Sequence, residues 1–250
     1  MSSASPVARS IAGLLWPLFL ACSALLAVVW IGGVSNGTFS RIGNGELRAA
    51  LEWCARGIDA VWLTFGAIVA YFALVRAEGL SVARGWAGAV LAVGFLLAAA
   101  SAWSGWPLGP VHFTTRLGWK LGPVPFGLPA LWLVVVVGAR EAALRWSPGA
   151  SHNVIAAISG FLCLVTAVNL DPIAWKVRVW WLWHPAQLTA YALPPWQNFP
   201  CWLLAGAALA WWMRSPHVVP RVARRSAEPV IALAFLNAIA LLTHLARLRQ

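Results

Sequence analysis

The sequence predicts an all-α protein: a polytopic transmembrane helical bundle of about seven spans, with two long interfacial or re-entrant loops on one face. Of its 250 residues, 61% are hydrophobic and only 10% are charged, and the mean hydropathy is +0.75. A soluble domain is about 45–50% apolar and about 25% charged. A soluble fold cannot hide so much apolar surface, whereas a helix in lipid exposes it without cost.

Seven apolar blocks account for this surface. A helical span needs about 20 predominantly apolar residues. We expect helices over residues 11–33, 53–75, 85–103, 126–144, 153–170, 199–213 and 229–246. A charge at the centre of a span is costly, and charged residues such as Arg84 and Arg214 stand at the block ends. The sixth block is short. We treat residues 1–250 as one transmembrane domain.

The connections between these blocks are of two kinds. Three are short and polar, at 77–84, 145–152 and 214–228, whereas 104–125 and 171–198 are long and mix Trp, Pro, His, Asn and Asp with apolar residues. Non-helical backbone at a membrane is tolerated where it packs on protein or lines a cavity. With seven spans, both long loops lie on one face, together with the start of the second helix.

Composition and motifs narrow the possible functions. The net charge is +11, but the arginines lie between apolar blocks, where they reach membrane lipids rather than nucleic acid. The cysteines and histidines lack ligand spacing, so no metal is expected, and no nucleotide-binding or hydrolase motif is present. We expect no cofactor. The Arg- and Ala-rich composition favours a bacterial inner (cytoplasmic) membrane.

Tryptophan is unusually frequent. Eight of the 18 tryptophans lie between Trp175 and Trp212. An interfacial aromatic belt explains several of them, such as Trp53, Trp86 and Trp146. The crowded run 180–183 has two interpretations: part of the same belt, or the wall of a pocket for a polyene or isoprenoid chain, where indole faces also stabilise a carbocation.

Three polar residues are candidates for chemistry. Asp171 follows an apolar block and precedes Pro172, so it is either a turn residue or a shielded carboxyl that delivers a proton. Asp59 is either an ion-pair partner of Arg56, one turn away, or a functional intramembrane carboxyl. His112, in the first long loop, is either a plain loop residue or a group that holds water.

Two ordered segments resemble a known family. The first runs from Ser104 through Trp106, Pro107 and His112 to Gly118 and continues in 122–125 and 129–132. The second contains Leu170-Asp171-Pro172, Trp181, Trp183, Tyr191, Asn198, Phe199 and Trp202. Together, over about residues 104–203, they resemble the membrane carotenoid-biosynthesis family of bisanhydrobacterioruberin and γ-carotene hydratases.

The resemblance implies a hydratase, a carbon–oxygen lyase that adds water to the terminal ψ-end double bond of an acyclic carotenoid. It implies Asp171 as proton donor, with Asp59 as a possible partner and His112 as a water-holding group. The implied substrate-binding residues are Trp106, Trp181, Trp183, Tyr191, Asn198, Phe199 and Trp202. Partners would be the lipid-soluble carotenoid or isoprenoid, membrane lipids and other carotenoid-pathway enzymes.

The sequence also departs from the family's pattern. Thr115 and Ala98 stand where the family has acidic residues, Val111 and Phe113 stand at tyrosine positions, and Val179 lies near a family glycine. Asp171 is the expected acid that remains. A non-catalytic carotenoid- or lipid-binding subunit of a larger membrane complex is therefore an alternative, and a small-molecule transporter is a third.

Overall fold

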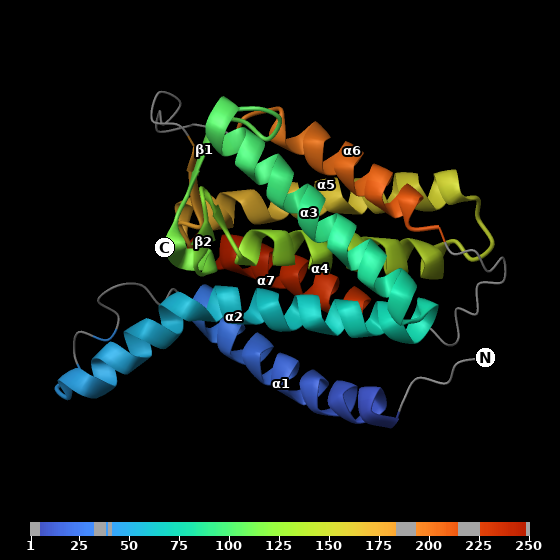
Figure 1. Cartoon of the computed structure of the whole chain (residues 1–250). Helices are drawn as coiled ribbons and strands as arrows, with labels where there is room; N and C mark the ends of the chain where they lie inside the picture. The colour runs from blue at the N-terminus through green and yellow to red at the C-terminus, as the bar shows by residue number, and fades with distance from the viewer. Residues whose placement is uncertain (1–5, 33–38, 40–41, 184–193, 215–225, 249–250) are drawn as a thin grey trace.

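A computed structural model of the chain describes residues 6–32, 39, 42–183, 194–214 and 226–248. Within these ranges the predicted helical bundle is confirmed (Figure 1). Its helices are α1 (Pro6–Ile31), α2 (Gly45–Glu78), α3 (Leu80–Ser104), α4 (Gly127–Trp146), α5 (His152–Lys176), α6 (Asn198–Trp212) and α7 (Glu228–Arg247). Between them lie the short strands β1 (Val111–Phe113), β2 (Lys120–Leu121), β3 (Val124–Pro125) and β4 (Trp181–Trp183), and a 3₁₀ turn, η1 (Thr115–Leu117).

Six of these helices, among the described residues, are long and apolar enough to cross a membrane. The exception is α6, whose 15 residues rise about 22 Å, against a hydrocarbon core of about 30 Å. It packs along α5. The chain is thus an integral membrane protein, and the short sixth block of the sequence is a short helix.

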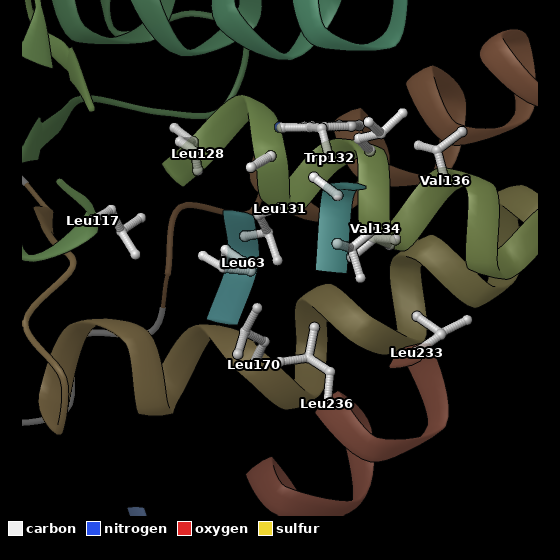
Figure 2. Close-up of a cluster of buried hydrophobic side chains, with 14 of the residues drawn as sticks. Leu63, Leu117, Leu128, Leu131, Trp132, Val134, Val136, Leu170, Leu233 and Leu236 are labelled. Atoms are coloured by element: carbon white, nitrogen blue, oxygen red, sulfur yellow. The ribbon is translucent and has the colours of Figure 1, made fainter. Parts of the chain in front are cut away.

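Helix α4 is the centre of the bundle. It contacts α2, α3, α5, α6 and α7, and every residue from Gly127 to Ala143 is buried. Figure 2 shows Leu131 and Val134 of α4 among Leu63 of α2, Leu170 of α5 and Leu236 of α7. Because protein surrounds α4 on all sides, its apolar side chains form the core of the protein rather than a lipid-facing surface.

Close packing of α5 on α6 depends on two glycines. A Cβ on Gly160 of α5 would lie 2.5 Å from the Leu203 carbonyl oxygen, and a Cβ on Gly206 of α6 would lie 2.6 Å from Cys163 Sγ. Small residues at such positions let helix backbones approach closely in a membrane, where association depends on packing rather than on the hydrophobic effect. This contact fixes the start of α6 beside the end of α5.

Several helix boundaries differ from those expected. Helix α2 begins at Gly45, eight residues before the expected 53, because the Asn44 side chain accepts a hydrogen bond from Leu47 N and caps it. Only Gly79 separates α2 from α3, so the expected loop at 77–84 is wrong. Helix α5 runs past residue 170 to Lys176.

The continuation of α5 places Asp171 and Pro172 inside a helix rather than at the start of the second long loop. The prediction of a turn at Asp-Pro is therefore wrong. A proline removes one backbone hydrogen bond from a helix, and neighbouring helices of a membrane protein compensate for such a loss.

The two long loops do meet on one face. Strands β1 and β4, one from each loop, pair antiparallel with Val111 opposite Trp183 and Phe113 opposite Trp181. They lie with the start of α4 and the ends of α3 and α5 at one end of the bundle (Figure 1). The expectation from the parity of the spans is confirmed, although the connecting contact is a strand pair rather than the crowded turn expected over residues 180–183.

The tryptophans expected in an interfacial belt differ in their exposure. Trp53 and Trp146 are exposed, as expected of interfacial residues, but Trp86 is 6% exposed. Its ring lies 4.8 Å below the Arg140 guanidinium, which forms an ion pair with Glu141. Trp86 is therefore a buried partner of a cation and not a belt residue.

Candidate functional site

The β1–β4 ladder organises the site. Side chains alternate along each strand, so Val111, Phe113, Trp181 and Trp183 are buried while the paired His112 is exposed. After β1, Thr114 N donates to Trp180 O at 2.9 Å and Thr114 Oγ1 to Val179 O at 2.6 Å. These bonds hold the chain before β4 against the first loop.

Asp171 projects from α5 toward this ladder and is 2% exposed. Trp181 Nε1 donates a hydrogen bond to Asp171 Oδ1 at 3.1 Å. The Trp183 indole adds a weaker favourable interaction, although its Nε1 has no hydrogen-bond partner of ordinary geometry, and neither has Asp171 Oδ2. The carboxyl is thus fixed through Oδ1 by an indole, whereas Oδ2 has no hydrogen-bond partner among the described residues.

Asp59, on α2, lies in a different setting. It is 1% exposed and accepts hydrogen bonds of 2.8 Å from Trp30 Nε1, Trp180 Nε1 and Arg178 Nε. The Arg178 guanidinium also forms an ion pair with it at 2.8 Å. The expected pairing with Arg56 is wrong, because that side chain donates instead to its own helix, at Glu52 O.

Further basic residues lie around Asp59. Burial lowers the pKa of the Arg116 guanidinium, in η1; the charges of Arg178 and Arg56 lower it further, and the charge of Asp59 opposes them. Together these residues make the region around the Asp59 carboxylate basic.

A small space, here called the inner cavity, lies beside the ladder. Its volume is about 20 Å³, and its lining consists of Leu108, Val111, Phe113, Leu128, Trp132, Trp181, Trp183, Asn198 and Trp202. The rings of Trp132 and Trp202 stack with centroids 4.0 Å apart and planes 5° apart. The cavity wall is therefore mostly aromatic, and Asn198 supplies a buried amide.

A larger depression, here called the outer hollow, lies on the other side of β1. It has a volume of about 440 Å³ and is lined by Ser101, Ala102, Trp103, Ser104, Gly105, Pro110, Val111 and His112. It contains the exposed histidine of the first loop and the exposed Ser104 at the end of α3. The outer hollow is more polar in character than the inner cavity.

The structure brings together some of the sequence-predicted residues and separates others. Trp181, Trp183, Asn198 and Trp202 line the inner cavity, and Asp171 is bonded to one of them. By contrast, His112 lies in the outer hollow and Trp106 is 62% exposed, so neither reaches Asp171. Phe199 is half-buried against the core. Tyr191 lies outside the described residues.

The two positions where the family has acids do not line the inner cavity. Ala98 is buried in α3, and Thr115 is exposed at the start of η1. Acids at these positions would not lie in the wall of the cavity beside Asp171. In the described ranges, no group of three or more His, Cys, Asp or Glu side chains is placed to hold a metal ion.

Sequence reasoning missed three residues of the site. Trp132 entered only through the family resemblance over 129–132 and was given no role in the site. Trp30 was assigned only to an apolar helix, and Arg178 was not singled out. The signal for Arg178 was its place close before the tryptophan run, on the same predicted face as Asp59. No local pattern distinguished Trp30 from other apolar residues.

Comparison with known proteins agrees with this geometry. A search of curated proteins and a search of solved structures each give no match. A family model described as "carotenoid biosynthesis protein" matches residues 58–249. The match is wider than the resemblance over 104–203, and it includes Asp59, both loops and the whole of the inner cavity. The chain therefore belongs to the family of carotenoid biosynthesis proteins.

Proposed function

We propose that this protein is a carotenoid hydratase that adds water to the terminal ψ-end double bond of an acyclic carotenoid. The observation that carries the proposal is the placement of one carboxyl, Asp171, directly behind the indole wall of a buried cavity. A role in carotenoid biosynthesis follows from the family. The choice of hydration rests on the chemistry that this carboxyl and this cavity offer together.

Asp171 is the proposed proton donor. A trisubstituted alkene is weakly basic, so it accepts a proton only from an acid shielded from water. No ion pair reaches Asp171 from the described residues, which suits a neutral acid, whereas Asp59 faces Arg178 and suits a permanent carboxylate. In this proposal Asp171 Oδ2, the oxygen without a hydrogen-bond partner, carries the proton.

The reaction balances with water as its only co-reactant. The Asp171 carboxyl transfers its proton to the less substituted alkene carbon, which leaves a tertiary cation and the Asp171 carboxylate. The faces of Trp181 and Trp183 stabilise that cation. A water oxygen then bonds to the cationic carbon and releases a proton to the carboxylate. The product is a tertiary alcohol, and the acid is restored.

Asp59 acts in this proposal through position rather than by proton transfer. Its hydrogen bond from Trp180 and its ion pair with Arg178 hold the segment that leads into β4. The next residue, Trp181, then reaches Asp171. Asp59 is thus a positioning residue, and the two carboxyls have different roles because only one of them faces a cation.

Substrate binding requires the cavity to open. A volume of about 20 Å³ is close to the about 10–15 Å³ that one water needs, and the branched end of an isoprenoid chain is much larger. In our proposal the Trp183 side chain moves aside, which admits the chain end from the lipid and brings it to Asp171 Oδ2. The polyene remains in the membrane.

Pigment extraction tests the proposal. Cells of a bacterial host that make an acyclic carotenoid are given the full chain, and their pigments are separated and weighed by mass spectrometry. We expect a product heavier by one water, with its hydroxyl on the tertiary carbon. Unchanged pigment in cells whose membranes contain the folded protein would contradict hydration. The same cells show whether the protein enters the inner membrane, as we propose.

The second candidate is a carotenoid- or lipid-binding subunit without catalysis. The specific observation in its favour is that Thr115 and Ala98 replace acids of the family and that the remaining acid lies behind indoles. Acyclic carotenoid that co-purifies with the protein but is never altered would support this role. Co-purification of other pathway enzymes would identify the complex.

A further inference from the structure

The inner cavity contains buried polar groups without partners. Trp132 Nε1 and Trp183 Nε1 have no hydrogen-bond partner among the described residues, and their side chains are 0% and 3% exposed. Asn198, also 3% exposed, adds an amide to the same wall. A buried donor without a partner is costly, and buried waters commonly satisfy such groups.

The size of the inner cavity matches one water molecule. Its volume of about 20 Å³ exceeds the about 10–15 Å³ that one water requires. A water there can accept hydrogen bonds from the two indole N–H groups and donate one to the Asn198 amide oxygen. This satisfies the two to four polar partners that a buried water needs.

One residue is common to the lining of this space and of the outer hollow. Val111 lines both. It is 8% exposed and stands at the first position of β1, next to His112, which lies in the outer hollow. On the outer side, the exposed Ser104 and His112 line the wall. Polar groups therefore lie on both sides of one valine.

We propose that the outer hollow is a water vestibule for the inner cavity and that Val111 is the partition through which water passes. The inference rests on the proposed hydration for its chemistry, because each turnover consumes one water in an aromatic pocket. It assigns to His112 and Ser104 the role of holding water at the entrance rather than at the reacting carbon.

The route also separates the two reactants. The carotenoid comes from the lipid and opens the Trp183 side of the cavity, whereas water comes from the membrane surface through β1. This arrangement limits the water in the inner cavity to one molecule at a time, which protects a reactive cation from side reactions.

Hydrogen exchange of indole groups tests the route without any need for turnover. The full chain, with isotope-labelled indole nitrogens, is placed in lipid nanodiscs and transferred to D₂O, and the signals of Trp132 and Trp183 are assigned from their Phe variants. We expect both N–H groups to exchange at least ten-fold faster than that of Trp30, which is equally buried but bonded to Asp59.

Substitution at the partition gives the decisive comparison. Val111→Phe should slow exchange at Trp132 and Trp183 by ten-fold or more, and Val111→Ala should accelerate it. Leu182→Phe is the matched control, because this residue lies on the paired strand and lines neither space. Exchange that is the same in all these variants would overturn the vestibule.

The same variants distinguish failure of the inference from failure of hydration. If wild-type protein hydrates its carotenoid, Val111→Phe should lower the product formed per molecule of bound carotenoid ten-fold or more. Full activity in that variant would refute the route and leave hydration intact. If wild-type protein forms no product, hydration is refuted, and the exchange data still decide whether water enters past Val111.

Discussion

Trp181 donates its indole N–H to Asp171, which joins a strand of the second long loop to the last turns of α5. The preceding residue, Trp180, donates in the same way to Asp59 on α2. Two adjacent indoles thus connect to two buried carboxyls on different helices. This arrangement fixes the loop between Asp59, which faces a cation, and Asp171, which lies behind the indole wall of the inner cavity.

The hydrogen bond from Trp181 to Asp171 should contribute more to stability and hydration than the size of the Trp181 ring. Trp181→Phe keeps a ring in the wall but removes the hydrogen bond to Asp171, so we expect a loss of about 1–2 kcal/mol in stability and reduced hydration. Trp175→Phe is the control, because Trp175 Nε1 is buried without a partner and its loss should be close to neutral. Thermal unfolding in detergent measures both, and equal effects would contradict the prediction.

The ion pair between Asp59 and Arg178 should show strong coupling. Removing one partner of a buried pair leaves an uncompensated charge and costs about 3–5 kcal/mol. We therefore expect Asp59→Asn and Arg178→Met each to lower the unfolding free energy by this amount, and the double variant to lose less than their sum. A double-mutant cycle measured by denaturant unfolding in micelles checks this. Strict additivity would show that the pair does not hold the loop.

Gly94 on α3 should be needed for the position of Trp132. A Cβ at Gly94 would lie 2.7 Å from Trp132 Cγ, whereas a Cβ at Gly88 of the same helix would meet nothing within 4 Å. We expect Gly94→Ala to destabilise the protein by about 1–3 kcal/mol and to disturb the stack of Trp132 on Trp202. Gly88→Ala should stabilise it by about 0.5–1 kcal/mol. Near-ultraviolet circular dichroism and thermal unfolding report both effects, and similar results for the two variants would be inconsistent with this packing.

Replacement of Val179 with glycine should stabilise the protein. Its φ of +53° lies in the left-handed region, which costs an L-residue about 1–2 kcal/mol and suits glycine, the residue that the family resemblance suggests nearby. We expect Val179→Gly to raise the unfolding free energy by up to about 1 kcal/mol, since glycine returns part of the gain as chain entropy. Val177, with φ of −104°, provides the opposite control: Val177→Gly should destabilise. Loss of stability in Val179→Gly would contradict the left-handed backbone conformation of Val179.

Much of the fold could be predicted because lipid imposes simple rules. Blocks of apolar residues with charges at their ends predicted the helices, and the parity of the spans predicted that both long loops share a face. The boundaries were less accessible: Asn44 caps α2 well before the apolar block begins, and α5 continues through Pro172 because its neighbours support the helix.

The site could be predicted only in part. Asp171, Trp181 and Trp183 stood out as unusual residues in an unusual loop, and the strand pairing places them together. Arg178 could not be assigned to Asp59, since the two lie 119 positions apart and nothing local favours it over Arg56. Alternation in β1 separates His112 from the cavity, and that separation depends on a register that no local pattern reveals.

The identity of the acid is the central claim and is tested by one substitution. Asp171→Asn keeps an oxygen that accepts the Trp181 hydrogen bond, so the protein should fold and bind carotenoid as before. Because a general acid contributes about 10²–10⁴-fold, its loss should lower hydration by that factor.

The measurement is the mass of the carotenoid product formed by wild-type and Asp171→Asn membranes in water labelled with heavy oxygen. The account predicts a labelled tertiary alcohol from the wild type and almost none from the variant, with equal amounts of bound carotenoid. An equal yield of labelled alcohol from Asp171→Asn would contradict it.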